Sequence, residues 1–86
     1  MEVNENLKKL DSILSKVLEV EEEEIADNMN QDTISNWDSF NALMLVSAIE
    51  TAFHVHFTMH EVVAMKSVRD IKTTLSAHGV KLESVS

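Results

Sequence analysis

The chain has 86 residues, enough for one domain but with little to spare for a deep substrate pocket, so a conventional enzyme is not expected. Fifteen acidic residues against seven basic ones give a net charge of −8, which disfavours binding to nucleic-acid phosphates and to anionic membranes. There is no cysteine, no apolar run long enough to span a membrane and no signal-peptide pattern, so we expect a cytoplasmic protein without disulfides or thiolate metal sites.

The first predicted helix runs from about Asn4 to Leu18. Its apolar residues recur at three- and four-residue spacing and form one face, which other helices must cover. The segment 19–36 that follows has four consecutive glutamates and neither Lys nor Arg. We expect a long acidic loop with solvated glutamates that is held to the core at three apolar points, Ile25, Met29 and Ile34.

A second helix is predicted to begin near Asp38 and to end around Phe53 or His54. Asp38 is a favourable N-cap because its carboxylate can accept a hydrogen bond from an unpaired backbone N–H in the first turn. Trp37 is expected to pack at the junction between the loop and this helix. Residues 54–57 alternate between histidine and apolar residues, but a single strand would have no partner, so we expect an extended connector.

Two capping patterns predict the remaining helices. Thr58 followed by Glu61 indicates a short third helix, and Ser67 followed by Asp70 opens a fourth helix, with Gly79 suited to the position past its end. The ordered core is expected over about 4–78, with a flexible tail over 80–86. The predicted fold is therefore all-α: one domain over 1–86, a four-helix bundle of three longer helices, one short third helix and a long first loop.

Ser39 is the residue with the clearest chemical potential. It lies at the start of the second helix, so its hydroxyl should reach solvent. The positive end of the helix dipole there favours a phosphate-bearing group. A serine at this position most often serves only as a cap, and the residue alone does not decide between the two roles.

Three histidines, His54, His56 and His60, are close together in the sequence and could in principle bind zinc. Nothing else in the pattern supports a metal site, and we expect these side chains to lie at the surface or in loop packing. No nucleophile–base pair or pair of carboxylates suggests catalysis either.

The run Trp37-Asp38-Ser39-Phe40, with the apolar and acidic positions that follow it, resembles the acyl carrier protein family. In that family an Asp-Ser-Leu motif opens the second helix. The resemblance continues through Val55, Phe57, Val62, Met65, Ser67-Val68 and Asp70-Ile71, and it covers most of the chain up to about Leu75.

The resemblance implies a specific function. A phosphopantetheinyl transferase would attach 4'-phosphopantetheine from coenzyme A to Ser39, with Asp38 as helix cap and part of the transferase-binding surface. Acyl groups would be carried as thioesters by a monomer without catalytic activity of its own. They would be handed to acyl-loading, ketosynthase or acyltransferase-type enzymes of fatty-acid, polyketide or other specialised acyl biosynthesis.

The resemblance also implies a partner surface along the second helix, formed by Phe40, Asn41, Leu43, Met44, Ser47 and Glu50. Fatty-acid-synthesis carriers place several acidic residues on this helix, whereas here only Glu50 follows Asp38, and Phe40 replaces the usual Leu. This departure favours a specialised pathway over a housekeeping role in fatty acid synthesis.

An acyl chain could also lie between the helices of such a carrier. The residues that would line this space are Leu45, Ile49, Phe57, Val62, Met65 and Ile71, and ordinary core packing is the simpler interpretation of the same set. The alternative function is an unmodified acidic helical module of the same fold that binds a protein partner.

Overall fold

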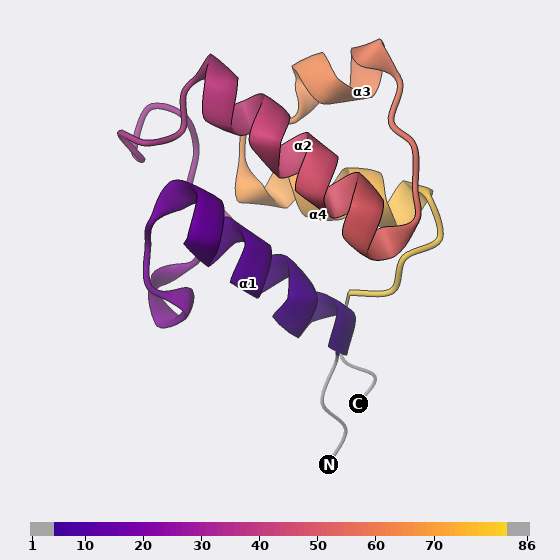
Figure 1. Cartoon of the computed structure of the whole chain (residues 1–86), viewed down its shortest axis with the longest axis horizontal. Helices are drawn as coiled ribbons and strands as arrows, with labels where there is room; N and C mark the ends of the chain where they lie inside the picture. The colour runs from indigo at the N-terminus through magenta and orange to yellow at the C-terminus, as the bar shows by residue number, and fades with distance from the viewer. Residues whose placement is uncertain (1–4, 83–86) are drawn as a thin grey trace.

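The computed structural model describes residues 5–82, which form a compact all-α bundle with no strand (Figure 1). The helices are α1 (Glu5–Leu18), α2 (Ser39–Phe53), α3 (Met59–Ala64) and α4 (Val68–Ala77). The sequence predicts three longer helices and one short third helix, and the structure confirms this arrangement. The predicted first residue of α1, Asn4, lies outside the described residues.

The core is built on the apolar face of α1. Leu10, Leu14 and Leu18 are each fully buried, and α1 packs along α2, whose Leu45 and Ile49 face inward. From α4, three buried side chains complete the contact: Val68, Ile71 and Leu75. The predicted 3.6-residue periodicity therefore identifies the face of α1 that the bundle covers.

The long connection between α1 and α2 follows the expected pattern. Its glutamates are exposed, while Ile25, Met29 and Ile34 are partly buried against the core. The glutamates of η1 (Glu22–Glu24) form a single 3₁₀ turn that the sequence analysis did not predict. An isolated antiparallel bridge between Asn30 and Ser67 joins the connection to the start of α4.

Hydrogen bonds to α4 fix this connection in place. The Val68 N–H donates to the Met29 carbonyl at 2.9 Å, and the Arg69 N–H donates to the Asp27 carbonyl at 3.0 Å. Both N–H groups lie in the first turn of α4, where no acceptor exists within the helix. The Lys72 ammonium also donates to the Asp27 carboxylate at 2.7 Å and lowers the pKa of that carboxyl group.

The packed region extends further toward the C-terminus than predicted. α4 ends as expected, with Gly79 at φ +88° just beyond it, in the left-handed region that glycine adopts without strain. The chain then returns to the core, where Leu82 is 4% exposed. The packed region therefore extends beyond the predicted limit at residue 78, because the apolar side chain of Leu82 packs against the core after the last helix has ended. Residues 83–86 of the predicted flexible tail lie outside the described residues.

The short α3 is held by the predicted capping box and by one side-chain contact to the end of α4. The Thr58 hydroxyl accepts the Glu61 N–H at 3.1 Å, and the Glu61 carboxylate accepts the Thr58 N–H at 2.9 Å. The same carboxylate lies 2.9 Å from Nε2 of His78, beyond the end of α4. The Thr58 backbone N–H and, secondarily, His78 hold the pKa of Glu61 below its ordinary value of 4.5.

Because the folded-state pKa of Glu61 is lowered, this carboxylate stabilises α3 above its ordinary pKa and stops doing so as the pH falls through the lower folded value. We expect the backbone amides of α3 to exchange with solvent faster, relative to those of α1, when the pH is lowered from about 5 to about 3. Hydrogen exchange followed by NMR, corrected for intrinsic rates, measures this change.

Glu61→Gln is the matched control, because the amide oxygen can still accept the Thr58 N–H but does not titrate over this range. The additional exchange at low pH should be absent from this variant. Equal pH dependence in the native chain and in Glu61→Gln would contradict a role for Glu61 ionisation in holding α3.

Candidate functional site

Ser39 is the first residue of α2 and is exposed to solvent. Asp38 precedes it in an extended conformation and caps the helix, with Oδ1 accepting the Asn41 N–H at 2.9 Å. The predicted N-cap is thus confirmed. The cap orders the first turn of the 15-residue helix and leaves the serine side chain at its positive end.

Asn41 ties this first turn to the rest of the bundle. Its side-chain amide donates to the Asn36 carbonyl, and the Asn36 side-chain amide donates to the Leu18 carbonyl at 3.0 Å. The start of α2 is therefore linked through the loop to the last residue of α1. Asn41, predicted to lie on the partner surface, therefore also has an internal role that the sequence does not predict, because a pair of asparagines has no distinctive spacing.

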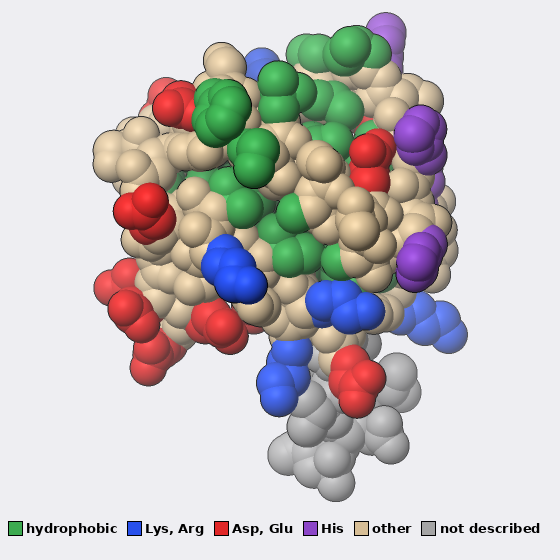
Figure 2. Space-filling model, in the orientation of Figure 1, with side chains coloured by type: hydrophobic (Ala, Val, Ile, Leu, Met, Phe, Trp, Pro, Cys, Tyr) green, Lys and Arg blue, Asp and Glu red, His purple; other side chains and the backbone are tan. Residues whose placement is uncertain are grey.

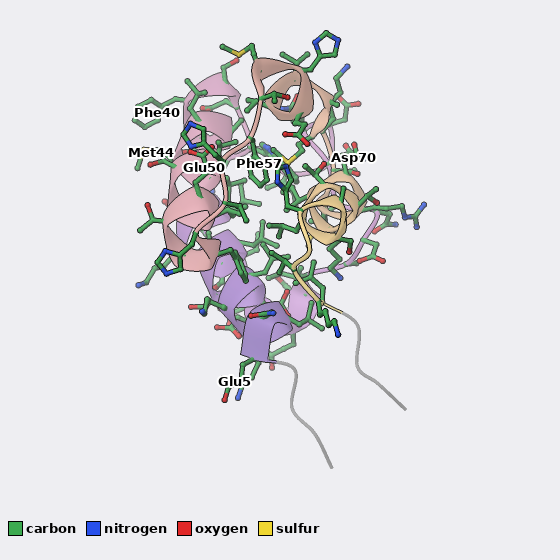
Figure 3. The ribbon with its side chains drawn as sticks, turned by 90° about the vertical axis from the view of Figure 1, so that its right-hand side faces the viewer. Glu5, Phe40, Met44, Glu50, Phe57 and Asp70 are labelled. Carbon is green, nitrogen blue, oxygen red and sulfur yellow. The ribbon has the colours of Figure 1, made fainter. Side chains whose placement is uncertain are left out.

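Exposed apolar side chains from α2 and α3 form a group that begins at Phe40, the residue after Ser39. We call it the apolar patch; it comprises Phe40, Leu43, Met44, Met59 and Val63. Phe40 is 69% exposed and Met59 is 76% exposed, which is unusual for large apolar side chains in a small domain. Figure 2 shows apolar surface gathered over the start of α2 and over α3, and Figure 3 shows Phe40 and Met44 on the side of α2 that faces away from α4.

The rest of the solvent side of α2 is almost without charge. Its only ionisable residue is Glu50, whose side chain is 25% exposed. The Glu50 carboxylate accepts the Phe57 N–H at 2.8 Å and lies 3.9 Å from Nδ1 of His56. Glu50, predicted as a partner contact, therefore fixes the connector between α2 and α3. Ser47, also predicted there, is exposed.

Five of the six residues predicted to line an acyl pocket border one small cavity. Its lining comprises Trp37, Ala42, Leu45, Val46, Ile49, Val62, Met65 and Ile71. Its volume of about 10 Å³ is near the space of one water molecule. Ligand-sized cavities are roughly 300–1,000 Å³, so the helices would have to part before an acyl chain could enter.

Phe57, the sixth predicted pocket residue, is buried but does not border this cavity. Its ring packs edge-on against the His78 ring, with 5.2 Å between the ring centroids. Three residues outside the predicted pocket set also border the cavity: Trp37, Ala42 and Val46. The helical spacing of Ala42 and Val46 to Leu45 and Ile49 was the signal that could have identified them.

The three histidines between residues 54 and 60 do not form a ligand set. His54, His56 and His60 are all exposed, and the described part of the chain has no group of three or more side chains arranged to hold a metal ion. His54 instead ends α2 in a left-handed conformation at φ 56°. Within residues 5–82, none of the helices has the length and apolar character needed to cross a bilayer.

The surroundings of Ser39 suit a covalently attached phosphate group. The hydroxyl lies at the surface, and the first N–H groups of α2 have no acceptors within the helix and can face an anion. No acidic residue of α2 other than Glu50, three turns away, would repel such a group. The neighbouring Asp38 carboxylate is occupied in capping Asn41.

Comparison with known proteins identifies the family. Residues 8–75 match the family model described as a phosphopantetheine attachment site, whereas the search among curated proteins gave no match. The match spans α1 to α4 and includes Ser39. Domains of this kind are typically non-catalytic carriers that interact with modifying and acyl-handling enzymes. The chain therefore belongs to the phosphopantetheine-attachment family, whose members carry covalently bound 4'-phosphopantetheine and share the acyl-carrier fold.

Proposed function

We propose that this protein is an acyl carrier protein in which Ser39 holds the 4'-phosphopantetheine arm. The observation that carries the proposal is the position of Ser39: exposed, first in α2 and directly after a capping aspartate. When bound, the arm supplies a terminal thiol that holds acyl groups as thioesters. The chain itself acts as a carrier without catalytic activity, and its own contribution is to present Ser39 and dock partner enzymes.

Attachment requires a phosphopantetheinyl transferase and coenzyme A. The Ser39 oxygen forms the new bond to phosphorus, the phosphoanhydride bond of coenzyme A breaks, the adenosine bisphosphate leaves, and the hydroxyl proton is released. The exposed N-terminal end of α2 supports this role, because it leaves the hydroxyl accessible and favours the resulting phosphodiester charge.

The first test is the intact mass of the chain after incubation with coenzyme A and a broad-specificity phosphopantetheinyl transferase. The native chain should gain one phosphopantetheine and Ser39→Ala should gain none. Ser35→Ala is the matched control, because Ser35 is also exposed, lies four residues away and is outside the helix. Failure of the native chain to be modified would favour the alternative, an unmodified interaction module of the same fold.

Asp38 should combine two roles that substitutions can separate. Asp38→Ala removes the acceptor for the Asn41 N–H and should lower the free energy of unfolding by about 0.5–2 kcal/mol. Asp38→Asn keeps a good capping residue but removes the negative charge, so its stability should stay near that of the native chain. If the transferase recognises the charge, Asp38→Asn should slow arm transfer while its urea unfolding midpoint is unchanged. Equal transfer rates for the native chain and Asp38→Asn would leave capping as the only role.

We further propose that acyl-handling enzymes and the transferase dock on the apolar patch, with Ser47 at its edge. Partners must approach Ser39, and the patch begins at the neighbouring Phe40. Apolar side chains left exposed at this density are typical of binding surfaces. The absence of other charged residues from α2 supports partners of specialised acyl pathways, such as polyketide synthesis, rather than the fatty-acid enzymes that bind acidic helices.

Phe40→Gln and Met44→Gln should each lower kcat/KM for arm transfer, on the order of tenfold for the more exposed Phe40, because they remove apolar contact at the centre of the interface. Their melting temperatures should hardly change, since neither side chain belongs to the core. The ratio of kcat/KM between the native chain and each variant should be the same at low and high salt, because the lost contact carries no charge. Ser12→Gln, an exposed change on α1, is the control. An equal effect of Ser12→Gln and Phe40→Gln would contradict docking on the patch.

A further inference from the structure

The indole of Trp37 is placed unusually for a structural side chain. Trp37 is 3% exposed, and its Nε1–H has no acceptor within the described range 5–82. It is the one fully buried side-chain nitrogen or oxygen in that range without a partner. A buried donor left unpaired costs free energy, so its presence calls for an explanation such as a ligand that pairs with it.

The surroundings of Trp37 indicate what kind of partner could satisfy the donor. Trp37 borders the cavity between α2, α3 and α4, and the other seven lining side chains carry neither nitrogen nor oxygen. A buried water needs two to four polar partners, so one indole N–H would hold it poorly. The better match is a mostly apolar molecule that carries its own acceptor oxygen.

The position of the cavity indicates how such a molecule could arrive. Trp37 is two residues from Ser39, and the cavity wall on one side comes from α3 through Val62 and from its cap residue Met65. α3 has six residues, and none of them is fully buried. The contact that ties it to the end of α4, between the Glu61 carboxylate and His78, is partly exposed, so water can replace it. Of the walls around the cavity, α3 is therefore the one that can move at the lowest cost.

We propose that the Trp37 indole N–H donates a hydrogen bond to an oxygen of the acyl cargo when the chain of that cargo enters between the helices. This inference rests on the proposed carrier function and adds the class of cargo: an acyl thioester with an acceptor oxygen within reach of Trp37. The oxygen is supplied either by the thioester carbonyl itself or by a keto or hydroxyl group along the chain. An alkyl chain without any oxygen leaves the donor unpaired.

Because the chain has a single tryptophan, one indole resonance reports on this contact. ¹⁵N-labelled protein is loaded with three cargoes of equal length: a β-keto acyl thioester, a saturated acyl thioester and an S-alkyl thioether without a carbonyl. The indole proton should move downfield and exchange more slowly with the β-keto cargo than with the thioether. If the saturated thioester causes a similar change, the acceptor is the thioester carbonyl, which both thioesters have. If only the β-keto cargo causes the change, the acceptor is the keto oxygen on its chain.

An indole resonance that is the same for all three cargoes would overturn the inference. Intact mass is measured on each sample first, so a chain that fails to accept the arm at Ser39 refutes the proposed function instead. The two failures are therefore distinguishable in the same experiment.

Trp37→Phe provides a second test, because it keeps an aromatic ring in the core but removes the N–H donor. The thioester of the β-keto cargo should react with hydroxylamine roughly three- to tenfold faster in the variant, as expected for loss of one hydrogen bond from the sequestered state. The S-alkyl thioether has no thioester bond and does not react with hydroxylamine. The reactivity of the protein-bound thioester is therefore compared with that of the coenzyme A thioester of the same acid in free solution. An unchanged ratio of protein-bound to free reactivity would contradict the role of the indole N–H.

Discussion

The first turn of α4 positions much of this molecule through two backbone N–H groups. Their hydrogen bonds to the Met29 and Asp27 carbonyls hold a connection of about twenty residues that has almost no regular structure of its own. A loop of this length would otherwise be free to move. The last part of the connection is held separately: Trp37 is buried in the core, Asp38 caps α2, and the Asn36 side chain donates to the Leu18 carbonyl, so contacts with α4 and with α1 together order the approach to Ser39.

The acidic side chains and the exposed apolar side chains lie on different parts of the surface. The glutamates of the connection gather near η1, while the apolar patch lies over the start of α2 and over α3 (Figure 2). Charges act over distances of about a Debye length and influence how partners approach, whereas apolar contacts act only after surfaces meet. The glutamates and the apolar patch belong to different elements, so substitutions in one leave the other unchanged, and the proposed docking on the patch can be tested separately from electrostatic approach.

Much of the fold could be predicted because its signals are local. The capping residues Asp38, Thr58 and Ser67 each lie just before the helix they predict, and the leucines of α1 mark its buried face. Asp38 and Ser39 were also identified correctly as the cap and first residue of α2. These features depend on neighbours three or four residues away, which a single sequence contains.

The features that sequence reasoning missed depend on contacts between distant residues. Glu50 stays a predicted partner contact, but nothing in the sequence indicated that its carboxylate accepts the Phe57 N–H. Phe57 was expected to face the cavity but packs against His78, twenty-one residues further along the chain. The exposure of Phe40 and Met44, by contrast, agrees with their predicted place on the solvent side of α2.

The burial of Leu82 has a practical consequence for where this domain can be cut from a longer chain or joined to another. The family match stops at residue 75, seven positions before Leu82. A fragment trimmed to that limit would remove an apolar side chain that fills the core, as well as His78, which supports both Phe57 and Glu61. The Asn6 side chain donates to the Lys81 carbonyl, so the first and last described segments meet at one end of the bundle. Linkers for fusion or surface immobilisation should therefore begin after residue 82, where they leave Ser39 and α2 unobstructed.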